Sequence, residues 1–176
     1  MSANPADMPA GADDAPPLRI GHGFDLHRLV PGKPLIVAGV ALEHDRGCDA
    51  HSDGDVVLHA LTDALLGAVA QGDIGALFPD DDPQWAGADS RQFLAEAVRR
   101  VEAAGYRVGN ADVTVVLERP KLRPHVDTMR EVLAALLKLP LSCVSLKGKT
   151  HERVDAVGVG DAIACHCVVL CASRRQ

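Results

Sequence analysis

The sequence is poor in aromatic residues, which are 3% of its 176 residues. Its core must therefore be packed with Val, Leu, Ile and Ala, and stacking on nucleic-acid bases, which needs aromatic side chains, is not expected. Positive charge is also in deficit, because 18 Lys and Arg stand against 24 Asp and Glu, a formal net charge of −6. This balance argues against nucleic acid and against acidic membrane surfaces as partners.

The sequence has no long apolar run, since none approaches the roughly 18 residues that span a bilayer. Residues 1–17 contain neither Lys nor Arg and no apolar stretch, so we expect neither a signal nor a transit peptide. Their Ala, Pro and Asp content predicts a flexible N-terminal tail. One folded domain over 18–173 and a short C-terminal tail over 174–176 are predicted to follow.

The five cysteines are odd in number and lack the tight spacing of a secreted disulfide scaffold, which favours the reducing cytoplasm. Cys165 and Cys167 lie two apart in a predicted strand, so their side chains share one face, with His166 on the other. We expect both to be small core residues, and a thiolate metal site is the alternative.

Hydrophobic periodicity predicts strands near 18–29, 35–40, 106–117, 142–149 and 162–171. The first predicted helix begins after Ser52, which would cap it, and is ended by Gly72. The second begins after its predicted cap Ser90, and the third begins at Pro124. Segments 44–54 and 73–88 are predicted loops, the second long enough to bind a ligand. This order predicts an α+β fold with the helices on one sheet face and another copy of the chain on the other.

A metal site is predicted from one strand and one helix. Asp25 and His27 lie one residue apart in the first strand and so share a face with Gly21 and Gly23, where a close approach is expected. His59 interrupts an otherwise apolar helix, on a polar stripe with Asp55 and Asp63. One carboxylate and two imidazoles suit zinc, and three protein ligands leave a position open for substrate.

Two alternatives to this zinc site remain open from these residues alone. The same ligand types hold non-haem Fe(II) in oxygenases, although those enzymes usually present them from a β-barrel. The other is a strand-edge hydrogen bond between Asp25 and His27, with His59 as a core histidine.

Phosphate binding is indicated by the cluster 147–152, which places two lysines, a threonine and a glutamate within one turn. It is not a P-loop, because Cys143 stands where that motif requires its first glycine. His51 and Ser52 precede the predicted helix, whose N-terminal amides form a natural anion site. A second basic patch spans 119–123. Both clusters also fit solvated surface, so a non-enzymatic, nucleotide-binding or metal-stabilised scaffold is a further alternative.

Several ordered motifs resemble one family over about 19–170. They are Gly-His-Gly-Phe-Asp-Leu-His at 21–27, His-Ser-Asp-Gly-Asp at 51–55, Leu-His-Ala-Leu-Thr-Asp-Ala-Leu at 58–65, Gly-Asp-Ile-Gly at 72–75, Phe-Pro-Asp at 78–80 and Gly-Ala-Asp-Ser-Arg at 87–91. The sequence closely resembles the 2-C-methyl-D-erythritol 2,4-cyclodiphosphate synthases.

The resemblance implies a single ferredoxin-like (chorismate-mutase-like) α+β domain, with helices on one face of a four-stranded sheet and the other face at a homotrimer interface. It implies a lyase of the non-mevalonate isoprenoid pathway with active sites between neighbouring subunits. The substrate would be 4-diphosphocytidyl-2-C-methyl-D-erythritol 2-phosphate, whose 2-phosphate attacks the diphosphate and releases CMP. Zinc and a second divalent cation, Mg²⁺ or Mn²⁺, would assist.

The resemblance also implies roles for particular residues. Asp25, His27 and His59 would hold zinc, Glu152 would help to hold the second cation, and His51 and Thr150 would stabilise the transition state. Substrate contacts would come from Ser52, Asp73, Ile74, Gly75, Phe78, Pro79, Asp80 and Asp82, and on the cytidine side from Leu117, Pro120, Lys121, Leu122, Arg123 and Lys149.

One departure from the family concerns the segment after Glu152. Ala156 and Val159 stand where many bacterial members carry an aromatic residue and an arginine that bear on a central trimer cavity. We therefore do not expect isoprenoid diphosphates to bind in such a cavity here.

Overall fold

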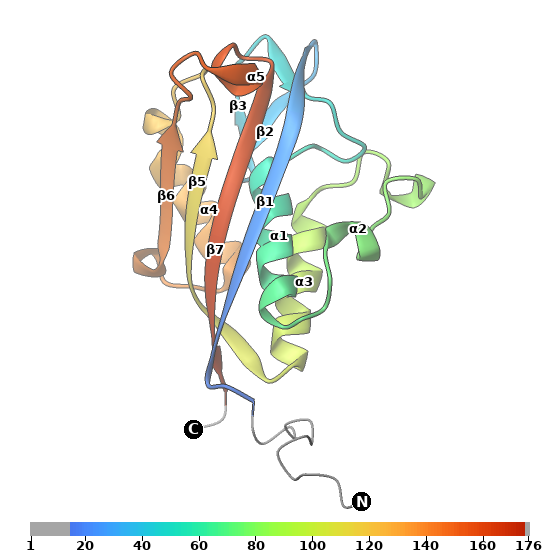
Figure 1. Cartoon of the computed structure of the whole chain (residues 1–176), viewed down its shortest axis with the longest axis vertical. Coiled ribbons are helices and arrows are strands. Elements are labelled where there is room, and N and C mark those ends of the chain that lie inside the picture. Colours follow the sequence, from blue (N-terminus) through green and yellow to red (C-terminus); the bar gives the residue numbers. More distant parts are fainter. Residues whose placement is uncertain (1–14, 175–176) are drawn as a thin grey trace, which may run out of the picture.

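Strands and helices form two layers in the computed structural model, which describes residues 15–174 (Figure 1). The strands and α-helices are β1 Leu18–Pro31, β2 Leu35–Val37, β3 Val40–Leu42, β4 Arg46–Cys48, α1 Val56–Ala68, α2 Ile74–Leu77, α3 Arg91–Ala103, β5 Tyr106–Val116, α4 Val126–Leu137, β6 Val144–Lys149, α5 Asp155–Gly158 and β7 Ala162–Ser173. Short 3₁₀ helices are η3 Pro83–Trp85, η4 Arg123–His125 and η5 Leu141–Cys143.

The main sheet has the strand order β4-β1-β7-β5-β6. Its centre is the long antiparallel pairing of β1 with β7, from Leu18 opposite Ala172 to Arg28 opposite Ala162, and only β5 and β6 run parallel. The α+β prediction is confirmed, but the sheet has five strands instead of four. The extra strand is β4, which pairs with the last three residues of β1 in a segment predicted as loop.

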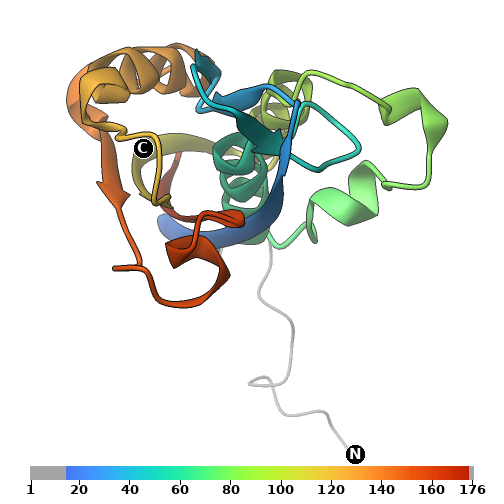
Figure 2. The ribbon, with the colours of Figure 1, turned by 90° about the horizontal axis from the view of Figure 1, so that it is seen from above.

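The helices α1, α3 and α4 lie on one side of this sheet, as predicted (Figures 1 and 2). Helix α1 packs directly on β1 because Gly21 and Gly23 have no side chains. A Cβ on Gly21 would stand 1.7 Å from the carbonyl oxygen of Ala64. Aliphatic residues such as Leu61 and Val113 fill the core between the layers, as the scarcity of aromatics predicted.

The first helix begins and ends differently from the prediction. Its N-cap is Asp55, a fully buried residue whose carboxylate accepts from the amides of Val57 and Leu58 at 3.0 and 3.2 Å. The same carboxylate accepts from the amides of Ala38 and Gly39. Those two residues form the turn of the β2–β3 hairpin, which replaces the single strand predicted over 35–40.

Ser52 lies too early to cap α1, and the helix already ends at Ala68, ahead of Gly72. Because the Asp55 carboxylate takes the amides of Val57 and Leu58, the anion site predicted at this helix end does not have those groups available. The predicted loop 73–88 contains α2 and η3, so it is partly helical.

The first strand, β1, begins at Leu18, and the last, β7, ends at Ser173. Just before β1, the Pro16 carbonyl accepts from the hydroxyl of Tyr106 at 2.8 Å. The tail predictions for 1–14 and 175–176 lie outside the described residues. No helix within 15–174 is long and apolar enough to cross a membrane.

All five cysteines are free, and Cys165 and Cys167 are fully buried with their sulfurs 3.6 Å apart. This burial agrees with the predicted core role. His166 points out of the other face of β7, where it is exposed.

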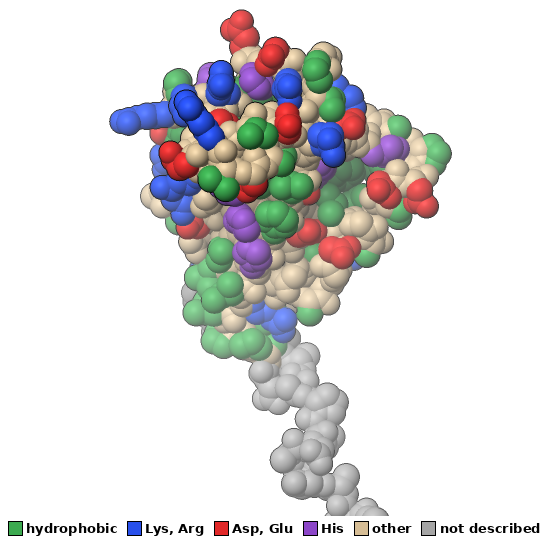
Figure 3. Space-filling model, turned by 45° about the horizontal axis from the view of Figure 1, so that its top comes forward, with side chains coloured by type: hydrophobic (Ala, Val, Ile, Leu, Met, Phe, Trp, Pro, Cys, Tyr) green, Lys and Arg blue, Asp and Glu red, His purple; other side chains and the backbone are tan. Residues whose placement is uncertain are grey.

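The outer face of the sheet carries exposed hydrophobic side chains. Ile20 is 71% exposed, Phe24 48% and Val168 44%, and they surround His22 and His166, whose rings lie 5.7 Å apart. Figure 3 shows histidines among hydrophobic side chains on this side of the molecule. We call the outward-facing residues of β1 and β7 the outer face.

Candidate metal centre and substrate pockets

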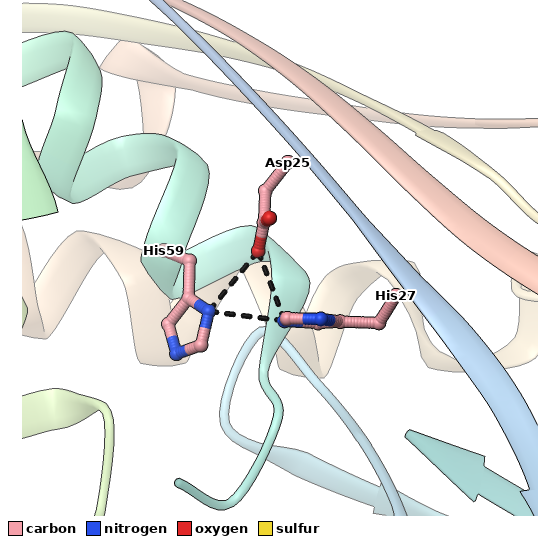
Figure 4. Close-up of side chains that lie close together, drawn as sticks. All are labelled: Asp25, His27 and His59. Atoms are coloured by element: carbon pink, nitrogen blue, oxygen red, sulfur yellow. Dashed lines mark hydrogen bonds and ion pairs between the residues drawn. The ribbon is translucent and has the colours of Figure 1, made fainter. Parts of the chain in front are cut away.

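Three side chains converge between β1 and α1 (Figure 4). Oδ2 of Asp25 lies 3.0 Å from Nε2 of His27 and 3.0 Å from Nδ1 of His59. The two ring nitrogens are 3.1 Å apart. Within residues 15–174, these are the side chains that come together in the manner of a metal site.

The convergence follows from local sequence. Successive strand residues alternate between faces, so Gly21, Gly23, Asp25 and His27 all point at α1. The two glycines let the helix backbone approach the strand. His59, one turn into the helix, then faces the pair on β1.

The three donor atoms fit a cation. A tetrahedral site with metal–ligand bonds of 2.0 Å has edges of about 3.3 Å, close to the separations found here. Burial by itself would raise the pKa of Asp25, but its polar contacts with the side chains of His27 and His59 outweigh burial and hold that pKa well below its usual range. Asp25 therefore presents a carboxylate to whatever lies between the two rings.

The polar stripe predicted on α1 divides into three separate roles. His59 faces the metal position, Asp55 caps the helix, and the carboxylate of Asp63 accepts from the amide of Ile74 at 2.7 Å. Asp63 thereby fixes the start of α2, and burial raises its pKa. Only one of the three stripe residues is a candidate ligand.

The three candidate ligands line a pocket of about 490 Å³, which we call the metal-site pocket. Phe78, Trp85 and Phe93 form an aromatic wall in it, with the rings of Phe78 and Phe93 4.5 Å apart. No role was predicted for Trp85 or Phe93 from the sequence. Because aromatic residues are scarce in this sequence, the presence of three of them within 78–93 was the signal that could have indicated an aromatic pocket. Predicted site residues lining this pocket are His51, Ser52, Ile74, Gly75, Phe78 and Asp80.

A second pocket, of about 450 Å³, lies between the loop after β5 and the end of β6, and we call it the Lys149 pocket. In it, the hydroxyl of Thr150 donates to Oε1 of Glu152 at 2.5 Å. Glu152 and Arg153 both have left-handed φ angles, +50° and +66°, so this loop holds a costly backbone conformation. Predicted site residues lining the pocket are Leu117, Lys121, Leu122, Arg123, Lys149, Thr150 and Glu152.

The two pockets have no lining residue in common among the described residues. The predicted catalytic residues are therefore divided, with His51 in one pocket and Thr150 in the other. Glu152 likewise does not join the three candidate metal ligands. Asp73, Pro79, Asp82 and Pro120 line neither pocket; Asp73 and Asp82 instead cap α2 and η3 with their side chains.

One carboxylate and two imidazoles that converge at the wall of a pocket, on an α+β sheet, are typical of a metal-dependent enzyme. Comparison with known proteins then identifies the family. Residues 18–172 match the YgbB family, and the chain belongs to it. It is 57% identical over 154 residues to the chloroplastic 2-C-methyl-D-erythritol 2,4-cyclodiphosphate synthase of Arabidopsis thaliana, covering 88% of this chain and 67% of that one.

Bacterial and structural relatives agree with this assignment. The synthase of Pasteurella multocida is 55% identical over 153 residues, covering 87% of this chain and 97% of the relative. A solved synthase structure with bound CDP superposes with a TM-score of 0.81 at 46% identity, covering 87% of this chain and 99% of that one. The CDP complex of IspF from Plasmodium falciparum superposes with a TM-score of 0.80 at 32% identity, covering 90% of this chain and 97% of that one.

Proposed function

We propose that this chain converts 4-diphosphocytidyl-2-C-methyl-D-erythritol 2-phosphate into 2-C-methyl-D-erythritol 2,4-cyclodiphosphate and releases CMP. The activity is that of its family, in the non-mevalonate route to isoprenoids. The observation that carries the proposal for this chain is the convergence of Asp25, His27 and His59 at the wall of a pocket large enough for a phosphorylated substrate.

The reaction brings two anions together. An oxygen of the 2-phosphate forms a bond to the β-phosphorus, and the bond from that phosphorus to the oxygen of the CMP phosphate breaks, so CMP leaves with its electron pair. Because the nucleophile and the diphosphate repel each other, the site must neutralise charge and align the groups. Zinc on the three ligands would supply a Lewis acid for the diphosphate oxygens.

The remaining pocket residues have complementary tasks in this proposal. His51, beside the metal position, stabilises the transition state, and Ser52 orients the 2-phosphate. Asp73 and Gly75 contact the substrate hydroxyls, with Ile74 beside them. Phe78 and the rest of the aromatic wall exclude water from the reacting groups.

The Lys149 pocket suits the cytidine diphosphate end. Lys121, Arg123 and Lys149 provide positive charge, while Leu117 and Leu122 offer apolar contact to a base. Glu152 would help to hold a second divalent cation, Mg²⁺ or Mn²⁺, whose preferred ligands are oxygens. The short Thr150–Glu152 hydrogen bond supports this, because it orients the carboxylate.

We further propose that two copies of the chain complete each site, in a homotrimer. A single substrate must touch both His51 and Thr150, which lie in different pockets of one chain. The exposed Ile20, Phe24 and Val168 of the outer face supply an apolar surface for the contact between copies.

The five free cysteines favour a reducing compartment such as the cytoplasm.

A direct turnover assay tests the proposal. The purified chain, loaded with zinc and supplied with Mg²⁺, is expected to release CMP and cyclic diphosphate in equal amounts from the cytidylyl substrate. Oxygen uptake with bound iron would instead support the oxygenase alternative, and tight nucleotide binding without turnover would support the scaffold.

A further inference from the structure

Ser90 occupies the N-cap position of α3 but does not cap the helix. Its side chain makes no hydrogen bond to the amides of the first turn. The residue is fully buried, and its hydroxyl oxygen lies 2.8 Å from Nε2 of His59. Serine at this position normally stabilises a helix through a hydrogen bond from a first-turn amide to its side chain. Here the hydroxyl is directed to a candidate metal ligand instead.

Asp53 holds Ser90 from the other side. Oδ1 of Asp53 accepts the hydroxyl hydrogen of Ser90, and Oδ2 accepts from the Ser90 amide at 3.1 Å. Two backbone bonds fasten the same segments together, from the Asp53 amide to the Ala88 carbonyl at 3.0 Å and from the Gly87 amide to the His51 carbonyl at 2.7 Å. The position of the Ser90 hydroxyl is therefore fixed by several independent contacts.

Counting hydrogens fixes the tautomer of His59. A serine hydroxyl has one hydrogen, and the one on Ser90 goes to the Asp53 carboxylate, which only accepts. The bond between Ser90 Oγ and His59 Nε2 then needs a hydrogen on Nε2. With Nε2 protonated, the neutral ring presents the lone pair of Nδ1, and Nδ1 is the atom that faces Asp25 and His27.

We propose that Asp53 and Ser90 are positioning residues for the metal centre: they keep Nε2 of His59 protonated and aim Nδ1 at the cation. This inference rests on the metal site proposed above. Neither residue touches the cation or the reacting atoms. Partners of this kind behind a histidine ligand typically change metal affinity 10- to 100-fold when they are lost.

Ser52 does not replace Ser90 in this role. Its hydroxyl also lies near Nε2 of His59, at 3.1 Å, but Ser52 is partly exposed in the metal-site pocket, and its hydroxyl oxygen accepts from the amide of Gly54 at 3.2 Å. Ser90 is buried and bound to Asp53, so it stays in place whether or not substrate is present.

The test measures zinc affinity of the full-length chain by competition with a chromogenic chelator. Ser90→Ala and Asp53→Asn are each expected to weaken zinc binding 10- to 100-fold. Ser90→Thr, which keeps the hydroxyl, should recover much of the loss. The control variants Ser142→Ala and Asp127→Asn make the same replacements at exposed positions, and they should bind zinc as the wild type does. Wild-type affinity in Ser90→Ala would overturn the proposal.

A second measurement needs no variant. Long-range ¹H–¹⁵N spectra of the zinc-free wild type at pH 8 report which nitrogen of His59 carries hydrogen, and we expect Nε2 to carry one. A ring protonated on Nδ1 alone would contradict the proposal, whatever the variants do. If the wild type binds no zinc, the proposed metal function fails; if it binds zinc and the tautomer is wrong, only the positioning role fails.

Discussion

The backbone of Gly23 lies against the carbonyl oxygen of Ala60, so close that a Cβ on Gly23 would stand 1.8 Å from that oxygen. Ala60 follows His59, and Gly23 precedes Asp25 by two residues. The contact therefore sets the distance between the two elements that carry the candidate metal ligands. Because the obstacle is backbone on both sides, no side-chain rotation relieves a substitution here.

Gly23→Ala is expected to separate β1 from α1. We expect the free energy of unfolding to fall by about 3 kcal/mol or more, at the upper end of the range for overpacked cores, and zinc binding to weaken with it. Urea unfolding and chelator competition measure the two effects. The matched control is Gly67→Ala, an exposed position in α1 with no atom within 4 Å of an added Cβ, where stability should stay the same or rise slightly. Equal stability of both variants would contradict the role given to Gly23.

Removing the imidazole of His59 should abolish catalysis and leave the fold. His59→Ala deletes one of three ligands, so we expect the chain to lose stoichiometric zinc and CMP release while its circular dichroism spectrum stays native. The control is His44→Ala, which removes a histidine whose Nδ1 lies 3.3 Å from Oδ1 of the exposed Asp45, and it should retain both zinc and turnover. Full turnover in His59→Ala would show that the metal site is wrongly assigned.

Two inactive variants should complement each other if active sites form between copies. His59→Ala damages the metal-site pocket and Glu152→Gln the Lys149 pocket, so each variant alone should release almost no CMP. Refolded together in equal amounts, random mixing leaves about a quarter of the sites with both pockets intact. Activity near that fraction supports the shared site. Complete absence of recovery in verified mixed oligomers would mean that one chain contains the whole site.

The buried carboxyl of Asp55 makes stability depend on pH. Burial raises its pKa from 3.8 to about 6, against the opposing effect of backbone hydrogen bonds such as that from Gly39. Since the folded chain holds this proton more tightly than the unfolded chain, the stability it contributes is complete below pH 3.8 and is lost as the pH rises through 6. The loss amounts to about 3 kcal/mol over that interval.

Asp55→Asn removes this titration. The difference in unfolding free energy between wild type and variant should therefore shrink as the pH rises from 4 to 7, in urea titrations with EDTA at one fixed protein concentration. A difference that grows with pH would mean that the amides of Ala38, Gly39, Val57 and Leu58 stabilise the carboxylate more than burial penalises it.

Part of the candidate site was predictable because it depends on local periodicity. The two-residue repeat of a strand places Asp25 and His27 on the face of Gly21 and Gly23, whatever the rest of the chain does. His59 was recognisable as a polar residue inside an apolar helix. These three predictions need only the direction of side chains along one element, and the structure brings the three groups together.

Other predictions failed where two residues compete for one task. Ser52 and Asp55 both resemble helix caps, and Asp55 is the cap because it also binds the hairpin turn at Ala38 and Gly39. Ser90 sits at a cap position, but Asp53, 37 residues earlier, draws its hydroxyl away. The local sequence shows which residues could cap a helix. The residue that decides which of them does so lies far away in the chain.

The amino-acid sequence by itself determined the α+β class, the aliphatic core, the close packing of a glycine face and the chemical identity of three candidate metal ligands, because each follows from composition or from short-range periodicity. Only the tertiary structure decided that the sheet has a fifth strand, that Asp53 and Ser90 stand behind His59, and that the predicted catalytic residues divide between two pockets. Those features depend on contacts between residues far apart in the chain, and such contacts form only when the packed core has fixed the elements relative to one another.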